Sequence, residues 1–332
     1  MRKILVVLVV VSQLAVLIYM AGKREILYHS GRRIFLRTAP VDPQDLFRGD
    51  YVSLNYEISR VPRKFWSPSL LKPFRAEIFP AGLPVYASLK EGEEGRAELV
   101  GLSDVRPSTG LYLQGKILYY SGYEMEMPVR YGLEAYFVEE GKGREIEAGR
   151  QRDEIQVPLE MEVAVAQDGS SQLITHRWSR VGIGIKLESD KSRPPRVYAA
   201  TVQLMNSSDK PLAVVDLPTG GSLRLVGVSG STNEVFQCVS ADAPVLKPSE
   251  SDVHMLQPNE IYEFNVNFWN PMWFVVKNSE TPKALPELQS FGQRFRFVYA
   301  PPSTAECKEL REAAQIWHGT LSTRAFSGGR VD

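Results

Sequence analysis

Short runs of alternating apolar and polar residues recur along the chain from residue 33 onward, and turn signals separate them. A period of two is typical of β-strands that bury one face. The runs fall at residues 85–89, 97–105, 111–120, 129–138, 155–166, 171–175, 197–205, 212–217, 222–228, 234–239, 261–268, 272–277 and 294–299. Glycine-containing turns, such as those at 91–95 and 168–169, are typical of the connections between such strands. The pattern predicts an all-β protein.

The run at 155–166 illustrates the alternation. Its polar positions are Gln156, Pro158, Glu160 and Glu162, and we expect them on a solvated face. Proline cannot donate a hydrogen bond to a neighbouring strand, so Pro158 favours an edge position.

The first 24 residues follow a different pattern. After Arg2 and Lys3, residues 4–21 carry no charged side chain. Eighteen helical residues extend about 27 Å, close to the hydrocarbon thickness of a bilayer and longer than the roughly 7 to 15 residues of a signal-peptide core. They predict an uncleaved signal anchor over residues 1–24, that is, a single transmembrane helix.

A charged, proline-rich stretch at 188–196 is the best linker in the chain. It predicts a β domain over 25–187, barrel-like or a sandwich, and an immunoglobulin-like β-sandwich over 197–326, followed by a frayed tail at 327–332. One short helix is expected in the second domain after Pro301 and Pro302, where Ser303 and Glu306 form a capping box.

The octet GDYVSLNY at residues 49–56 is the most informative motif. In an extended strand Val52, Leu54 and Tyr56 share an apolar face. A short helical turn over 42–47 precedes the octet. Asp50 then lies at the strand entrance, where its carboxylate can accept bonds from turn amides. We interpret Asp50 as a turn clamp, with a catalytic acid as the alternative.

The octet resembles the signature of the GDYXXLXY protein family of bacteria, and the likeness extends over about residues 25–187, with 131–147 as a second signature and 163–169 as a closing strand. The C-terminal half is assigned to no family. The positions that carry the resemblance are Gly49, Asp50, Tyr51, Leu54, Tyr56, Gly132, Glu134, Tyr136, Glu140, Gly141 and Glu147. The resemblance implies an extracytoplasmic domain on a membrane segment, in the company of a polytopic membrane protein. It implies no reaction.

Charges around the apolar segment give conflicting signals about its orientation. Arg2 and Lys3 favour an N-terminus inside the cytoplasm, whereas four cations follow the segment: Lys23, Arg24, Arg32 and Arg33. Together with the family resemblance, we favour a body outside the cytoplasmic membrane, on the periplasmic side.

Composition narrows the partners and the redox chemistry. The 39 basic and 39 acidic residues cancel, so charge gives no reason to expect a nucleic-acid partner. The only cysteines, Cys238 and Cys307, are compatible with one disulfide in an oxidising compartment, and two separate buried thiols are the alternative.

The sequence shows no recognisable motif for catalysis or for a cofactor. The four histidines lack the close spacing of metal ligands, so no metal site is expected, and neither a phosphate loop nor a dinucleotide fingerprint is present, so no cofactor is expected. An anchored β domain with a Gly-Asp strand also resembles type I signal peptidases. Their nucleophilic serine would fall at Val41, which has no proton to lose.

Two further groups have competing interpretations. Glu134, Glu139, Glu140, Glu145 and Glu147 surround Gly141-Lys142-Gly143; a hairpin turn with a solvated acidic face is favoured over a pair of catalytic carboxylates. Trp269 and Trp273 flank a turn, where they cover the end of the sandwich or form an exposed aromatic contact surface.

These observations predict a membrane-anchored extracytoplasmic binding or assembly module of the bacterial envelope, without catalysis. The alternative is an envelope hydrolase with a site around Asp50 and the acidic hairpin 134–147.

Overall fold

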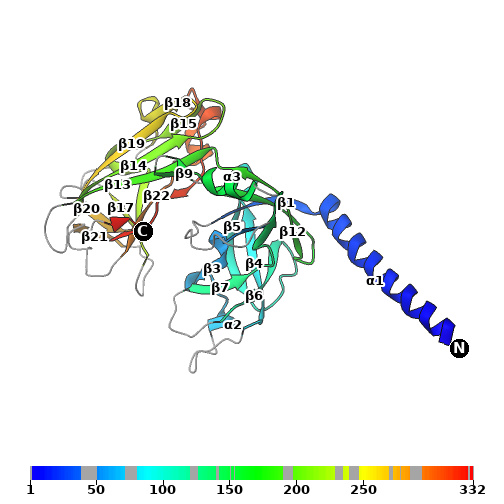
Figure 1. Cartoon of the computed structure of the whole chain (residues 1–332). Coiled ribbons are helices and arrows are strands. Elements are labelled where there is room, and N and C mark those ends of the chain that lie inside the picture. Colours follow the sequence, from blue (N-terminus) through cyan, green and yellow to red (C-terminus); the bar gives the residue numbers. More distant parts are fainter. Residues whose placement is uncertain are drawn as a thin grey trace. The chain divides into compact units, whose positions relative to one another are not determined.

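A computed structural model describes most of the chain (Figure 1). The described residues are 2–38, 51–71, 81–119, 126–139, 142–149, 151–152, 154–189, 197–228, 235–238, 247–268, 272–276, 278–284, 294–327 and 330–331. They are mostly β, as predicted, with one long apolar helix at the N-terminus. The chain divides into two compact units: unit 1 is Met1–Gly143 with Leu159–Arg177, and unit 2 is Arg144–Pro158 with Trp178–Asp332.

Helix α1, Arg2–Ser30, carries exposed apolar side chains from Ile4 to Met20. Among the described residues it is the one helix long and apolar enough to cross a membrane, by length and composition. The backbone N–H of Gly31 donates to the carbonyl of Leu27 at 3.0 Å and closes the last turn. The chain then enters the first strand of unit 1.

The described part of unit 1 contains three sheets, in which the β1–β11, β2–β8, β3–β7, β6–β7, β4–β6 and β4–β5 pairs are antiparallel. The first has the order β1 (Arg32–Arg37), β11 (Leu159–Val165), β12 (Ser171–Trp178), and the second has the order β3 (Arg60–Pro62), β7 (Glu126–Arg130), β6 (Leu111–Ile117), β4 (Pro84–Glu91), β5 (Ala97–Ser103). The third pairs β2 (Tyr51–Ser53) with β8 (Ala135–Phe137). Short helical segments lie between them: η1 (Glu57–Ser59), η2 (Arg63–Phe65), α2 (Pro68–Leu71) and η3 (Glu93–Gly95).

Among its described residues, unit 2 has two large sheets and one small sheet. One large sheet has the order β19 (Ile261–Asn267), β14 (Val197–Asn206), β13 (Val181–Ser189), β10 (Ile155–Gln156), β9 (Gln151–Arg152). The other has the order β21 (Asn278–Ala284), β20 (Met272–Val275), β17 (Val235–Cys238), β16 (Leu223–Gly227), β22 (Phe295–Tyr299), β24 (Phe326–Ser327), β25 (Arg330–Val331), with β23 (Leu321–Ser322) also on β22. The small sheet pairs β15 (Leu212–Val215) with β18 (Val253–Leu256). Helical segments are η4 (Pro218–Gly220), η5 (Glu250–Asp252), α5 (Thr304–Cys307) and η6 (Ala313–Gln315), while α3 (Lys142–Gly149) begins at the end of the first stretch of unit 1.

The core of unit 2 is rich in aromatic side chains. Buried residues from both large sheets form one cluster, which includes Phe236, Phe264, Trp273, Phe295, Phe297, Tyr299 and Phe326. Phe297 is fully buried, and its ring stacks on Phe326 with centroids 5.7 Å apart. A smaller cluster contains Ala213, Val215, Cys307 and Ile316.

The units divide at a different place from the predicted linker. Strands β13 and β14, on either side of 188–196, are antiparallel neighbours from Val181↔Asn206 to Ser189↔Val197. Both lie in unit 2, whereas the chain passes between the units at 143/144, 158/159 and 177/178. A polar, proline-rich segment is equally suited to a loop between two paired strands.

The prediction for residues 155–166 was wrong in its details. The run is interrupted at Val157 and Pro158, and β11 lies between β1 and β12 rather than at an edge. Pro158 stands outside both strands, so its missing N–H costs no ladder bond.

The C-terminal predictions have mixed outcomes. The capping box is confirmed, since the backbone N–H of Ser303 donates to Glu306 Oε2 at 2.7 Å. The tail is not wholly frayed, because β24 pairs with β25 through Phe326↔Val331 and Ser327↔Arg330.

Candidate functional site

The two family-like segments are hydrogen-bonded to each other in unit 1. Strand β2, from the octet, pairs with β8, from the second signature, with Val52 opposite Tyr136. Beyond the strand, the N–H of Leu54 donates to the carbonyl of Glu134 at 2.8 Å. Val52 and Leu54 are buried, as expected for the apolar face. Segments about 80 residues apart in the sequence therefore form one local structure.

Two buried tyrosines join these segments. The hydroxyl of Tyr56 donates to the carbonyl of Leu133 at 2.7 Å, and the hydroxyl of Tyr131 donates to the carbonyl of Ile58 at 2.9 Å. Burial, reinforced by the negative charge of Glu134, raises the pKa of both phenols well above the ordinary value. Both phenols therefore stay neutral and act as fixed donors at physiological pH.

Glu134 has a local role in the same structure. Its Oε1 accepts a hydrogen bond from the backbone N–H of Tyr131 at 2.6 Å. Gly132, between them, has φ of +79°, a left-handed conformation in which other residues are strained. The glycine and the carboxylate together form the tight turn that leads into β8.

Tyr136 pairs with a histidine that the sequence did not single out. A hydrogen bond of 3.1 Å joins the Tyr136 hydroxyl to Nδ1 of His176 on β12, and the two rings meet edge to face with centroids 5.5 Å apart. Burial lowers the pKa of His176, so the neutral imidazole is favoured near pH 7. The unprotonated Nδ1 of a neutral ring can accept a hydrogen bond from the Tyr136 hydroxyl.

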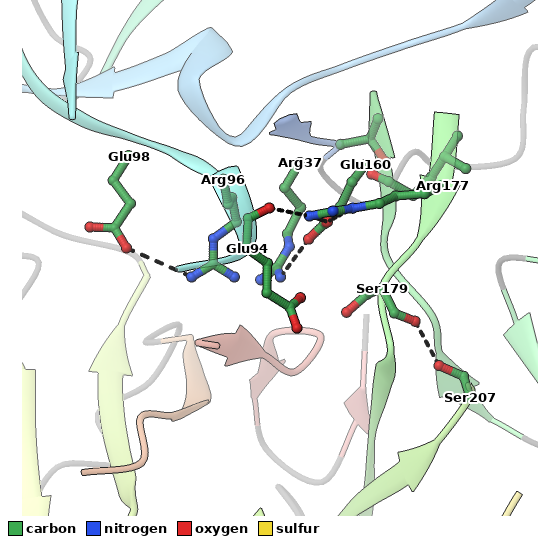
Figure 2. A network of polar contacts seen from close by, with 10 residues as sticks. Arg37, Glu94, Arg96, Glu98, Glu160, Arg177, Ser179 and Ser207 are labelled. Carbon is green, nitrogen blue, oxygen red and sulfur yellow. Dashed lines mark hydrogen bonds and ion pairs between the residues drawn. The ribbon is translucent and has the colours of Figure 1, made fainter. Parts of the chain in front are cut away.

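The most buried charges of unit 1 gather around Glu160 (Figure 2). Its Oε1 lies 2.9 Å from Arg37 Nη2, and its Oε2 accepts from Arg177 Nε at 2.9 Å. The side chains of Arg37 and Glu160 are 5% and 4% exposed, so this ion pair is shielded from water. Three strands supply the triad, because Arg37 is on β1, directly opposite Glu160 on β11, and Arg177 is on β12.

Further contacts extend this cluster toward η3. Arg177 also donates from Nη2 to the carbonyl of Glu94 at 2.9 Å, and its guanidinium lies 3.5 Å from the ring centroid of Phe35. Arg96 is buried nearby, with Nη2 3.7 Å from Glu98 Oε1. Burial and the positive charge of Arg37 lower the pKa of Arg96. We call Arg37, Arg96, Glu160 and Arg177 the buried charge cluster.

The electrostatics of the buried charge cluster favour structure over proton transfer. Burial alone would raise the pKa of Glu160, but the charges and hydrogen bonds of Arg37 and Arg177 outweigh it and hold the pKa below the ordinary value. A carboxylate whose two oxygens already accept bonds from arginines is a poor general acid or base near pH 7. Its chemistry is that of a clamp across three strands.

The acidic segment does not form the predicted hairpin. Residues 142–149 are helix α3, and Glu145 is exposed on it. Glu139 pairs with Lys142 at 2.7 Å across a solvated surface. The hairpin interpretation was wrong because Lys, Arg, Glu and Ala supply enough helix propensity to continue past a glycine. Glu140 and Gly141 lie outside the described residues, as does the side chain of Glu147.

Several other predicted residues fall outside the described part of the chain or inside the core. Gly49, Asp50 and Trp269 lie outside the described residues, and of Tyr51 only the backbone is described. Trp273 is 1% exposed and its ring centroid lies 5.9 Å from that of Phe297. Of the two interpretations, the structure therefore supports the packed one for Trp273, whose indole belongs to the core rather than to an exposed contact surface.

The two cysteines are buried in different places. Cys238 is in the large aromatic cluster, and Cys307 is in the small cluster with Ala213 and Val215. They form no disulfide with each other. The second alternative, two separate buried thiols, describes the structure, and burial raises the pKa of Cys238 to about 11, which makes it unreactive as a nucleophile.

No group of three or more His, Cys, Asp or Glu side chains in the described part of the chain is arranged to hold a metal ion. The buried charge cluster was missed because Glu160 was assigned to the polar face of its strand and because residues 32–37 were not recognised as a strand. A useful signal was available: Arg33 and Arg37 alternate with Ile34 and Leu36, which is a strand pattern.

Comparison with known proteins identifies a family for the N-terminal part of the chain. The model of the GDYXXLXY protein family matches residues 13–175, from the second half of α1 to most of β12. No curated protein and no solved structure matches the chain. Residues 13–175 of the chain belong to the GDYXXLXY protein family.

Proposed function

We propose that this chain is a single-pass protein of the cytoplasmic membrane whose body lies on the periplasmic side and acts as a binding or assembly module, without catalysis. Helix α1 is the signal anchor. Its apolar side chains from Ile4 to Met20 are exposed, which suits a lipid environment and is costly in water.

The internal use of the signature side chains is the observation that carries this proposal. Tyr56 and Tyr131 donate to backbone carbonyls, and Glu134 accepts from a backbone amide. Reactive groups of an enzyme converge on a place where a substrate can bind. These groups instead satisfy the backbone of the segment that carries them, which suits a module built to present a surface.

The proposed architecture is a barrel-like or sandwich arrangement in unit 1 and an immunoglobulin-like sandwich in unit 2. For unit 2, the support is that one buried cluster contains residues from both large sheets, such as Val202 of β14 and Leu225 of β16. Two sheets that share a core in this way are typical of a β-sandwich.

The partner that we propose is a polytopic membrane protein in the same bilayer. A single anchor helix confines the body to the membrane surface, which raises its effective concentration toward other membrane proteins. The near-zero net charge gives no reason for a nucleic-acid partner.

The topology is tested by fusing, after Asp332, a reporter enzyme that is active only outside the cytoplasm. Activity is expected from the fusion, and a matched fusion to a reporter that is active only inside is expected to be silent. The reverse pattern contradicts the localisation. Fusion at the C-terminus leaves the β13–β14 pairing intact, which a fusion near residue 190 would interrupt.

The binding role is tested by photo-crosslinking in native membranes from Phe137, which is 76% exposed on β8. A specific adduct with an integral membrane protein is expected. A crosslinker at Tyr119, which is 59% exposed in the same unit, is the matched control. An Asp50→Asn variant that kept its fold but lost a hydrolytic activity of the wild type would instead establish the hydrolase alternative.

A further inference from the structure

The membrane end of unit 1 is marked by contacts between the last turns of α1 and β11. Leu27 is 9% exposed, although it belongs to a helix whose other apolar side chains are mostly solvent-exposed. A Cβ added to Gly31 would lie 2.9 Å from the Cβ of Ala164 on β11. Only a glycine lets the helix end approach this strand so closely.

Polar contacts continue this attachment along the helix. Lys23 Nζ lies 3.4 Å from Asp168 Oδ2 in the turn between β11 and β12. The guanidinium of Arg33 donates to the carbonyl of Tyr28 and lies over its ring, 5.1 Å from the centroid. Contacts at Lys23, Leu27 and Gly31 are spaced by one turn each, so one face of the helix end is attached to unit 1.

The turn that Lys23 reaches is well defined. The backbone N–H of Ser170 donates to Asp168 Oδ1 at 2.9 Å, and the N–H of Gly169 donates to the carbonyl of Ala166 at 3.0 Å. Gly169 has φ of +79°, as such a turn requires. We call residues 166–170 the β11–β12 turn.

Arg106 lies at the same turn. Its Nε donates to the hydroxyl of Tyr112 at 2.7 Å, and its Nη2 lies 3.4 Å from the carbonyl of Gln167. A guanidinium has five donors in a planar fork that matches phosphate oxygens. Two cations therefore contact the β11–β12 turn, Lys23 through Asp168 and Arg106 through the carbonyl of Gln167, and Arg24 follows Lys23 on α1.

The depth of this turn follows from the length of the apolar segment. Lys23 is two residues beyond Ala21, the last residue of the uncharged segment, which is about 3 Å along a helix. Each head-group layer is about 5 to 8 Å thick outside the hydrocarbon. A residue 3.4 Å from the Lys23 ammonium is consequently at head-group level when α1 spans the bilayer.

We propose that unit 1 is held on the membrane surface, with the β11–β12 turn in the phospholipid head-group layer and with Lys23, Arg24 and Arg106 toward lipid phosphates. This inference rests on the proposed membrane anchor and adds that the body has a fixed orientation relative to the bilayer. The end of α1 holds unit 1 rigidly, because contacts at three successive turns restrict rotation of the body about the helix end.

Site-directed nitroxide labels on the full chain in phospholipid vesicles test this proposal. A label at Gln167→Cys is compared with one at Tyr119→Cys; both positions are exposed. Gln114 N–H bonds to Gly169 O at 2.9 Å, and Tyr119 is five residues beyond Gln114, roughly 15 Å away in extended chain. Cys238 and Cys307 are buried, and the unsubstituted protein checks that they take up no label.

Vesicles doped with a lipid that carries a nickel chelate in its head group are expected to relax the Gln167 label several-fold more than the Tyr119 label. The variant Asp168→Asn, which removes the carboxylate that pairs with Lys23 without adding a cation to the turn, is expected to reduce this difference. Equal relaxation at the two positions would overturn the proposal.

A third label, at Ala15→Cys, separates this failure from failure of the anchor. Ala15 is in the middle of the apolar segment, so its label is expected to be accessible to oxygen and shielded from water-soluble nickel. If the Ala15 label is in hydrocarbon and the Gln167 label is not near head groups, the membrane anchor is supported and the fixed orientation of unit 1 is contradicted. If the Ala15 label is exposed to water, both fail.

Discussion

Units 1 and 2 stabilise similar β-structure with different kinds of core. Unit 2 packs phenylalanine, tyrosine and tryptophan rings between two sheets. The ring centroid of Phe297 lies within 6.1 Å of the ring centroids of Phe268, Phe326 and Trp273. Unit 1 instead places the buried charge cluster among its strands, where the carboxylate of Glu160 joins Arg37 and Arg177. Aromatic packing depends on area and shape, whereas a buried polar group needs particular partners.

The family match falls on the unit that holds the buried charge cluster. The family match covers residues 13–175, which hold nearly all of unit 1 and little of unit 2. A polar contact such as Tyr56 to Leu133 specifies one residue type at one position, while an aliphatic or aromatic core tolerates exchanges of similar volume. Positions fixed by polar contacts can therefore make a recognisable motif through their structural requirements alone.

The largest effect is expected from Phe297→Ala in unit 2. Removal of a fully buried ring from a packed cluster leaves a cavity, and such changes cost about 3 to 5 kcal/mol. Hydrogen exchange of β16 and β22 peptides, measured by mass spectrometry on the full chain in detergent, should accelerate at all pH values. Ile261→Ala, at a position 40% exposed on β19, is the control and should change exchange little. Equal effects of the two variants would contradict an aromatic core.

A comparably large effect is expected from Glu160→Gln in unit 1. The substitution leaves Arg37 buried with no carboxylate at its Nη2, and removal of one partner from a buried ion pair costs about 3 to 5 kcal/mol. Exchange should accelerate in peptides from β1, β11 and β12, while β16 and β22 serve as internal controls.

The matched control for that variant is Glu162→Gln on the same strand. Glu162 lies 3.6 Å from Arg33 with both side chains partly exposed, so the loss should be below about 1 kcal/mol. If Glu162→Gln destabilised unit 1 as much as Glu160→Gln, burial would not be the cause of the effect.

The sequence predicted the pattern of strands better than the burial of charges. Short runs of strand-forming residues bounded by turn signals identified β4, β6, β14, β16 and β22. Alternation of apolar and polar residues placed Glu160 on a solvated face, and it failed there because β11 is covered on both faces, with Arg37 opposite and Arg177 beside it. Pairing between distant strands decides which polar positions are buried, and a local pattern does not contain it.

Prediction of the candidate site had a similar limit. The two signatures were recognised, but their hydrogen bonding through Leu54 and Glu134 joins residues 80 positions apart and is visible only in the fold. Residues 142–149 were misassigned because glycines at both ends indicate a turn as readily as helix boundaries.

A smaller effect is expected from Tyr56→Phe. The ring remains, but the carbonyl of Leu133 loses its donor in a buried site, which costs about 1 to 3 kcal/mol. The change should open β2 and β8 peptides to exchange while the peptides of unit 2 stay protected. Tyr119→Phe, at an exposed position, controls for loss of a hydroxyl. A silent Tyr56→Phe would show that the signature tyrosine is retained for something other than this bond.

The smallest effect, and the sharpest contrast between the units, is expected on mild acidification. The pKa of Glu160 is below its ordinary value, so in the window between the folded and the unfolded pKa the unfolded state binds more protons, and unit 1 loses stability as pH falls through that window.

Asp216 in unit 2 behaves oppositely, and this makes the comparison testable within one molecule. Burial raises the pKa of Asp216, and the negative charge of Asp252 raises it further. The hydrogen bond from Tyr262 and the attraction of His254 lower the pKa, but they do not outweigh burial. Between the unfolded and the folded pKa the folded state then binds more protons, so the contribution of Asp216 to stability grows as pH falls from neutrality through the folded pKa and levels off below the unfolded one. After correction for intrinsic exchange rates, the pH dependence of β11 protection should flatten in Glu160→Gln, and that of β15 should change in the opposite sense in Asp216→Asn. Opposite pKa shifts require that acid weakens unit 1 through Glu160 and strengthens unit 2 through Asp216. A change of the same sign in both variants would therefore mean that the two carboxylates are in similar environments.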